Sequence, residues 1–246
     1  MAESRCAVVT GASSGIGAAI ARRLAAAGYS VLGGARRVEA VREILEPPGG
    51  RALPLDVTDD ASVAGFVDEL GAVDVLVNNA GLSLGLAPVA EGSIEDWRTM
   101  YETNVLGVLR LTRALVPSLV ASGDGHLVNV GSIAGFETYP GGAGYTASKH
   151  ALRALTRTLR QELLGEPVRV TEICPGLVET EFSLVRFRGD RDRAAAVYRG
   201  LQPLTAEDVA ECVLWALGRP PHVNIDEIVV RPRDQATATL VHRRGR

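Results

Sequence analysis

The chain of 246 residues lacks a strong charge of either sign and a long uninterrupted apolar run. Its 26 basic and 29 acidic residues leave a net charge of −3, so we expect no nucleic-acid partner. No uninterrupted run reaches the roughly 18 apolar residues of a membrane span, and we expect no membrane partner. Polar residues and then a strand pattern follow Met1, which is not the pattern of a secretory signal.

Cysteine is scarce, with only Cys6, Cys174 and Cys212, which are widely separated. An odd number of cysteines without His or Cys at ligand spacing predicts neither a disulfide framework nor a metal site. His222 and His242 have no ligand partners at useful spacing either. We therefore expect no metal, buried thiols and a cytoplasmic location.

Lysine is almost absent: every basic residue is arginine except Lys149. Arginine is a planar, permanently charged fork, whereas lysine is a compact ammonium group that fits close to a small oxygen and shifts the pKa of a neighbour. Chance could leave one lysine anywhere, but the residues around Lys149, described below, favour a functional role.

Apolar strand patterns alternate with helical patterns along the whole chain, and hydrophobic residues make up 46% of it, which excludes disorder. The expected strands are Cys6–Thr10, Ser30–Ala35, Ala52–Asp56, Val73–Val77, His126–Val130, Arg169–Ile173 and Glu227–Val230. The expected helices are Gly15–Ala27, Val38–Leu45, Ala61–Leu70, Ile94–Ser122 with a bend near Asn104, Tyr145–Leu164 and Ala206–Leu217. Such apolar strands, each followed by a helix, predict a parallel sheet covered on both faces.

No repeat or Pro/Ser-rich linker divides the chain, so residues 1–246 are expected to form a single α/β domain. Ser93 and Thr205, each followed three residues later by Asp, are expected to cap helices. Two segments show no clear pattern: residues 174–200, rich in Arg and Gly, and the tail at 232–246.

A glycine-rich turn stands between the first expected strand and the first helix. Glycines at this point let backbone N–H groups approach a pyrophosphate at the positive end of the helix. A purely structural turn is the alternative, but the place in the first βαβ unit favours a dinucleotide site. The residues expected to bind the cofactor here are Gly11, Ser13, Ser14, Gly15, Ile16 and Gly17.

The end of the second strand indicates which dinucleotide binds. An NAD site places Asp or Glu there for the ribose 2′-hydroxyl, whereas this chain has Arg36 and Arg37. Two guanidinium groups are suited to a 2′-phosphate, so we expect NADP (NADP⁺/NADPH). Asp56 and Val57, after the third strand, are expected to hold the adenine edge, with a helix N-cap as the alternative for Asp56.

Tyr145 and Lys149 are four residues apart in an expected helix and so share one face. A tyrosine exchanges protons poorly near neutral pH unless a nearby cation stabilises the phenolate, and Lys149 is that cation. Ser132, just after the fifth strand, is placed to orient a substrate oxygen. The three residue types form a proton-transfer unit that suits the interconversion of an alcohol and a carbonyl.

Together the motifs resemble those of the short-chain dehydrogenase/reductase family. They are Thr10–Gly17, Asn78–Gly81, Asn104, Ser132 and Tyr145–Lys149. The resemblance implies a Rossmann-like, doubly wound, seven-stranded parallel sheet with helices on both faces. It also implies Tyr145 as acid/base, Lys149 as its pKa modifier and ribose ligand, Ser132 as substrate orienter, and Asn104 as holder of a relay water.

The resemblance adds further cofactor contacts, namely Asn79, Ala80, Gly81, Tyr145, Lys149, Pro175, Gly176, Val178 and Thr180. Members of the family are usually homotetramers or dimers. Within it the chain is most similar to the NADP-dependent 3-hydroxy acid dehydrogenases, which include serine and allo-threonine dehydrogenases. The segments that carry this likeness are 78–87, 95–97, 175–190, 221–225 and 241–243, with departures at Cys174 and Glu179.

A 3-hydroxy acid needs a cation for its carboxylate, and Arg186 and Arg188 are the local candidates, with solvation or pairing to Asp190 and Asp192 as the alternative. The substrate-binding residues are thus expected to be Ser132, Tyr145 and Arg186. The leading hypothesis is an NADP-dependent dehydrogenase of small hydroxy acids. A ketoreductase of secondary metabolism, a 3-oxoacyl reductase and a non-catalytic NADP(H)-binding regulator are the alternatives.

Overall fold

The computed structural model describes residues 4–46 and 49–245. Residues 1–3, 47–48 and 246 lie outside it. The expectation of no secretory signal at the start of the chain, and the last residue of the expected tail, therefore fall outside the described residues. The strands are β1 (Cys6–Thr10), β2 (Ser30–Ala35), β3 (Gly50–Pro54), β4 (Val75–Asn78), β5 (Gly125–Val130), β6 (Val168–Pro175) and β7 (Glu227–Val230).

These strands form one seven-stranded sheet in the order β3-β2-β1-β4-β5-β6-β7, and every pair in it is parallel. The order reverses between β1 and β4, which makes their carboxyl ends the switch point where ligands bind in such sheets. The Rossmann-like, doubly wound fold expected from the motifs is confirmed.

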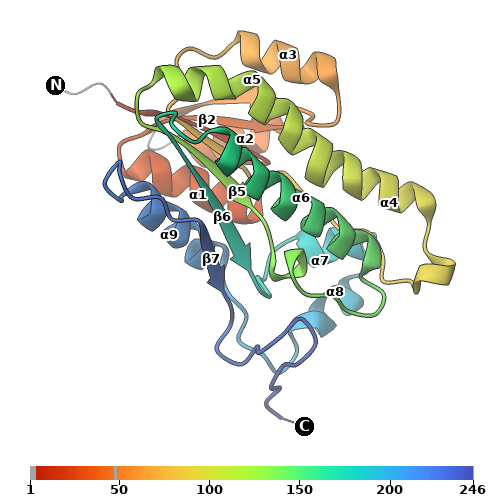
Figure 1. Ribbon diagram of the computed structural model, residues 1–246. Helices are drawn as coiled ribbons and strands as arrows, with labels where there is room; N and C mark the ends of the chain where they lie inside the picture. The colour runs from red at the N-terminus through yellow and green to blue at the C-terminus, as the bar shows by residue number, and fades with distance from the viewer. Residues whose placement is uncertain (1–3, 47–48, 246) are drawn as a thin grey trace.

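Helices cover both faces of this sheet (Figure 1). They are α1 (Gly15–Ala26), α2 (Val38–Leu45), α3 (Asp60–Asp68), α4 (Ile94–Tyr101), α5 (Gly107–Ala121), α6 (Ala143–Glu162), α7 (Phe182–Arg186), α8 (Arg191–Tyr198) and α9 (Ala206–Leu217). The alternation of side chains along β1 divides the core, because Ala7 and Val9 pack with α1 and α9 while Val8 packs with α3 and α5.

The expected helix Ile94–Ser122 is one continuous stretch, Ile94–Ala121, in which a π-helical turn at Glu102–Leu106 separates α4 from α5. At Asn104, where a bend is expected, the structure has this π turn. Ser93 and Thr205 cap α4 and α9 as predicted, and at Thr205 both halves of the capping box are present.

By length and composition alone, the stretch Ile94–Ala121 could cross a membrane, since an 18-residue window in it has a mean hydropathy of 1.3. The search for uninterrupted apolar runs missed this window. Burial accounts for its composition, because Leu111, Leu115 and Leu119 of α5 lie in the core beneath the sheet. A core helix passes the same test, so the window is weak evidence for a span.

Other boundaries differ from expectation. α6 begins at Ala143, two residues early, so Tyr145 lies in its first turn. The segment 174–200, which has no clear sequence pattern, contains the two short helices α7 and α8. Short 3-10 helices at Val89–Glu91 and Ile133–Gly135 complete the described elements.

Candidate active site

The glycine turn connects β1 to α1 at the switch point of the sheet. Gly11 and Gly15 have φ of 65° and 54°, a left-handed backbone that favours glycine. A Cβ at Gly17 would lie 2.3 Å from both the Asn79 side-chain nitrogen and the Gly11 carbonyl oxygen. Gly17 therefore allows close packing and, unlike the other turn residues predicted to bind cofactor, does not line the cavity.

Hydrogen bonds join the ends of β1 and β4 across the switch point. The Thr10 hydroxyl accepts from the backbone N–H groups of Asn79 and Ala80, both at 3.0 Å. The Asn79 side chain donates back to the Thr10 carbonyl at 2.9 Å. These bonds fix Asn79, Ala80 and Gly81 beside the glycine turn, where all three line the cavity.

Arg36 and Arg37, which follow β2, both line the cavity next to the glycine turn. The Arg37 guanidinium donates to the Ser14 hydroxyl at 2.8 Å and to the Glu181 carboxylate at 3.0 Å. Arg37 and Ser14 hold the pKa of Glu181 below its usual value. The two arginines thus supply positive charge at the edge of the turn.

Asp56 and Val57 also line the cavity, on the side of β3. The Asp56 carboxylate accepts from the backbone and the hydroxyl of Thr58, and these bonds lower its pKa. The alternative reading of Asp56 as a helix N-cap is wrong, because Asp59 caps α3 by accepting from Ser62 at 2.8 Å.

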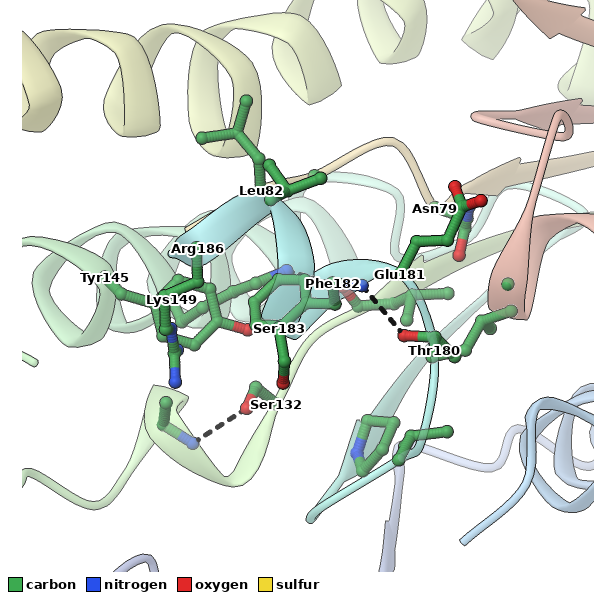
Figure 2. Close-up of a pocket in the computed structure, with 18 of the residues that line it drawn as sticks. Asn79, Leu82, Ser132, Tyr145, Lys149, Thr180, Glu181, Phe182, Ser183 and Arg186 are labelled. Carbon is green, nitrogen blue, oxygen red and sulfur yellow. Dashed lines mark hydrogen bonds between the residues drawn. The ribbon is translucent and has the colours of Figure 1, made fainter. Parts of the chain in front are cut away.

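A single cavity of about 800 Å³ connects this nucleotide end with the end that holds Ser132, Tyr145 and Lys149. Figure 2 shows Asn79 on one side of this space and Tyr145, Lys149 and Arg186 on the other. Pro175, the last residue of β6, and Gly176, Val178 and Thr180 after it also line the cavity. Apart from Gly17, Asn104 and the clamp candidate Arg188, every predicted site residue lines this cavity.

Ser132, Tyr145 and Lys149 come from two neighbouring elements. Ser132 ends the turn after β5 and caps a 3-10 helix by accepting from Ala134 at 3.1 Å. Tyr145 and Lys149 lie one turn apart on α6, with the Lys149 nitrogen 6.0 Å from the centre of the Tyr145 ring. The Lys149 ammonium donates to the Val130 carbonyl at 2.8 Å. All three are buried at the carboxyl end of β5.

Burial dominates the proton affinities of these groups. It raises the pKa of Tyr145 to about 12, against the lowering effects of Arg186 and of the Ser132 hydroxyl. It lowers the pKa of Lys149 to about 8, because a buried ammonium is poorly solvated. Of these neighbours, the cation that acts on the Tyr145 phenol here is Arg186.

Asn104 is fully buried in the π turn and does not line the cavity. Its side-chain oxygen accepts from the Leu82 N–H, and its side-chain nitrogen donates to the Leu82 carbonyl and to the Ser148 hydroxyl, all at 2.9 Å. The side chain thereby fixes the loop after β4 to α6, and the predicted relay water would have to bind elsewhere on this residue.

Arg186, at the end of α7, faces the catalytic end of the cavity. It donates to the Ser83 hydroxyl and to the Tyr139 hydroxyl, both at 3.0 Å. Its guanidinium carbon lies 5.3 Å from the centre of the Tyr145 ring and 5.1 Å from that of Phe182. Among residues 4–46 and 49–245, no carboxylate forms an ion pair with Arg186.

Arg188, the other predicted clamp residue, points elsewhere. It donates to both carboxylate oxygens of Asp96, at 2.7 and 2.8 Å, and does not line the cavity. Pairing with Asp190 or Asp192, the alternative, is wrong as well: among the described residues neither forms an ion pair with Arg186 or Arg188, and the Asp190 side chain accepts from the Arg193 backbone N–H at the start of α8.

Several lining residues escaped the sequence analysis. Tyr139 lines the cavity and holds Arg186 together with Ser83, which lies in the segment 78–87 but does not line the cavity. The C-terminal tail is the larger omission, because it folds over the cavity and lines it with Gln235, Ala238, Thr239, Val241 and Arg243. Glu137, just after the Ser132 turn, anchors this tail through Arg231 and the Ala238 N–H. The tail has no periodic pattern, so no sequence signal pointed to this role.

Residues 5–189 match the model of the short chain dehydrogenase family. The chain belongs to this family. An oxidoreductase from Mycobacterium tuberculosis is 61% identical over 235 residues, which cover 96% of this chain and 94% of that protein. An NADP-dependent 3-hydroxy acid dehydrogenase from Salmonella typhi is 44% identical over 96% of this chain and 98% of that protein.

A solved structure of serine dehydrogenase complexed with NADP⁺ is similar as well, with a TM-score of 0.92 and 42% identity over 97% of this chain and all of that chain. The resemblance drawn from the motifs is therefore confirmed, both for the family and for its 3-hydroxy acid dehydrogenases. The chain is an oxidoreductase of the kind that acts on CH–OH groups.

Proposed function

We propose that the protein is an NADP-dependent dehydrogenase that interconverts the 3-hydroxyl and 3-oxo groups of small 3-hydroxy acids such as serine or allo-threonine. The observation that carries the substrate class is Arg186. Its charge faces Tyr145 inside the cavity, its hydrogen-bond partners are the neutral hydroxyls of Ser83 and Tyr139, and no carboxylate of the described chain pairs with it. A partly buried cation of this kind favours a substrate that brings its own anion.

NADP fits the residues at the other end of the cavity. The left-handed Gly11 and Gly15 leave room for a pyrophosphate at the start of α1, and Arg36 and Arg37 supply charge for a 2′-phosphate. These residues would hold NADP, which would supply a hydride acceptor for oxidation and, in its reduced form, a hydride donor for reduction. Lys149 is placed to bind the nicotinamide ribose.

In oxidation, Tyr145 takes the proton of the substrate hydroxyl as the carbon loses its hydride, and Ser132 holds the same oxygen. In reduction, the Tyr145 phenol gives the proton back to the forming alkoxide. The charges of Arg186 and, from one turn of α6 away, Lys149 favour the phenolate, and Arg186 also holds the substrate carboxylate. Asn104 completes the set: its side chain fixes α6 to the loop after β4, and its backbone is left to hold the proposed relay water.

The chain acts as one domain, residues 1–246, in the cytoplasm. We propose a homotetramer, or a dimer, as the assembly, with a small hydroxy acid or ketone and NADP as its ligands and neither a metal, a nucleic acid nor a membrane among its partners.

The test is nicotinamide absorbance at 340 nm with purified enzyme and L-allo-threonine, first with NADP⁺ and then with NAD⁺. Reduction of NADP⁺ that is much faster than reduction of NAD⁺ is expected. If neither NADP⁺ nor NAD⁺ is reduced by a protein that still binds NADPH, the hydroxy-acid assignment is overturned in favour of the ketoreductase alternative. A protein that binds NADPH but turns over neither hydroxy acids nor ketones would be a regulator.

A further inference from the structure

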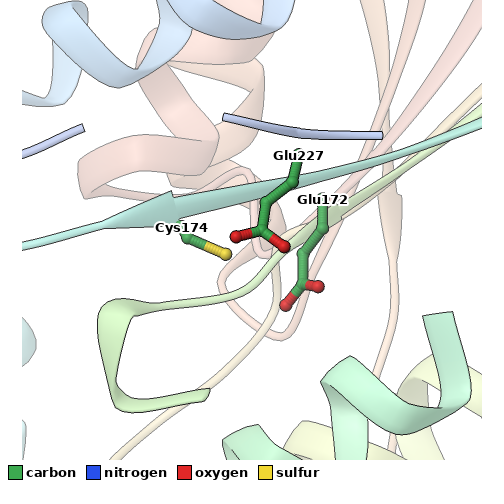
Figure 3. A group of neighbouring side chains, drawn as sticks. All are labelled: Glu172, Cys174 and Glu227. Atoms are coloured by element: carbon green, nitrogen blue, oxygen red, sulfur yellow. The ribbon is translucent and has the colours of Figure 1, made fainter. Parts of the chain in front are cut away.

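A buried cluster of acidic and thiol groups lies behind the catalytic residues, on the edge of the sheet. Glu172 and Cys174 of β6 and Glu227 of β7 have their oxygen and sulfur atoms within 4.8 Å of one another. Figure 3 shows the three side chains on the same side of the two strands. The catalytic roles proposed above use none of them.

Glu172 is the unusual member, because it is only 1% exposed and its Oε1 has no hydrogen-bond partner among the described residues. Burying a carboxylate without full compensation is costly. The backbone makes room for it: a Cβ at Gly131 would lie 2.3 Å from the Glu172 Oε1. The carboxylate therefore lies against the residue directly before Ser132.

Cations of α6 surround this cluster. Arg153 pairs with Glu227 at 2.7 Å, and Arg157 reaches the same carboxylate at 3.8 Å. Glu227 thus has its own partners at the outer side. Lys149, one turn before Arg153, donates to Val130, whose neighbour Gly131 contacts Glu172. Arg153 and Arg157 thus balance Glu227 directly, whereas Glu172 forms no ion pair among residues 4–46 and 49–245 and lies at the strand end that holds Lys149.

We propose that Glu172 is a positioning residue that acts through Lys149, as the counter-ion that keeps this buried lysine charged and directed at the end of β5. The inference rests on the proposed function, in which the charge of Lys149 serves Tyr145. It adds a residue from β6 to a site otherwise built from β5 and α6.

The proton affinities agree with this arrangement. Burial lowers the pKa of Lys149, and Glu172 is the first of the groups that oppose this effect. Burial raises the pKa of Glu172, and Arg153 and Lys149 oppose it, while Glu227 adds to it. The Cys174 thiol stays protonated, because burial raises its pKa. The groups that face Glu172 are therefore Lys149 and Arg153 from α6, Cys174 from its own strand and Glu227 from β7.

The test uses the single lysine of the chain. Lysine labelled with ¹³C at Cε gives one lysine signal, and its titration reports the pKa of Lys149 directly in the whole protein, without substrate. In Glu172→Gln the midpoint should fall by about one pH unit or more relative to wild type, since loss of an opposite charge nearby removes that much stabilisation. The matched control, Glu227→Gln, should shift it by much less.

An unchanged midpoint in folded Glu172→Gln, or an equal shift in Glu227→Gln, would overturn the proposal. If Glu172→Gln fails to fold, Glu172→Asp keeps the charge but withdraws it from Lys149, and a smaller fall is expected; no fall in that variant overturns the proposal too. Because the titration needs no turnover, it separates failure of this inference from failure of the proposed reaction. The alkaline limb of kcat for reduction should also move to lower pH in Glu172→Gln.

Discussion

The two ends of the cavity are built in different ways. The nucleotide end uses backbone conformation within short segments: left-handed glycines, a strand end and two consecutive arginines. The substrate end is assembled from side chains that are far apart in the chain. Arg186 is an example, because it is held by Ser83, 103 residues away, and by Tyr139, 47 residues away.

This contrast suggests how the enzyme divides its tasks. A cradle of backbone groups binds a part that is common to all dinucleotides, and it tolerates little change because glycine is required at several points. The substrate end is built from single side chains of α7, the loop after β4 and the tail, so each of them can be substituted separately. We therefore expect substitutions at the substrate end to alter substrate choice, and substitutions at the nucleotide end to alter cofactor choice.

The largest expected effect is that of Tyr145→Phe, at the substrate end. Loss of the phenol oxygen should reduce kcat by about 10³-fold or more, because proton transfer at the substrate oxygen is lost. Binding of NADPH, followed by its fluorescence, should persist. Substantial turnover in this variant would show that the proposed acid/base is wrong.

Arg186→Leu should affect the substrate end alone. It should lower kcat/KM for a 3-hydroxy acid by about 100-fold, since a charged contact with the substrate is lost, and leave the dissociation constant of NADPH nearly unchanged. Arg188→Leu is the matched control, because Arg188 pairs with Asp96 outside the cavity. Equal losses in the two variants would contradict the assignment of the carboxylate to Arg186.

Arg36→Ala should affect the nucleotide end alone. Loss of a charge-assisted hydrogen bond to a phosphate should raise KM for NADP⁺ by about tenfold or more, with little change for NAD⁺. Arg37→Ala should act in the same direction and also release Glu181 from the glycine turn. Steady-state kinetics with both cofactors check this, and an equal loss with NAD⁺ would count against a 2′-phosphate site.

The smallest effect concerns neither end. Burial lowers the pKa of His126, at the opposite end of β5, to about 3. The unfolded chain therefore binds a proton between about pH 6.5 and 3 that the folded chain does not, and the free energy of unfolding should fall by up to about 1.4 kcal/mol per pH unit as pH decreases. Urea unfolding at pH 7 and 5 should show this loss in wild type and a smaller loss in His126→Gln.

The sequence predicted best those cavity-lining residues whose signals are local. The glycine turn, Arg36, Arg37 and the spacing of Tyr145 and Lys149 each lie within a few residues, and strand and helix patterns place them in the sheet. Boundaries were less accurate: β3 lies two residues earlier than expected, and α6 begins at Ala143.

The other residues around the cavity could not be predicted from local sequence signals. The tail that lines the cavity has no periodic pattern, and Tyr139 and Ser83 are recognised only when Arg186 is seen between them. Arg186 and Arg188 are two residues apart and chemically identical, yet one faces Tyr145 and the other faces Asp96. The two side chains point in different directions because the chain turns at the end of α7.

The central claim is that the substrate end selects an anion, and it is tested most directly by comparing an acid with its ester. We would measure kcat/KM of the wild-type enzyme with NADP⁺ for 3-hydroxybutyrate and for methyl 3-hydroxybutyrate, and repeat the pair with Arg186→Leu. The account predicts that wild type prefers the acid by about tenfold or more and that the variant loses this preference. Equal use of acid and ester by the wild-type enzyme would contradict it.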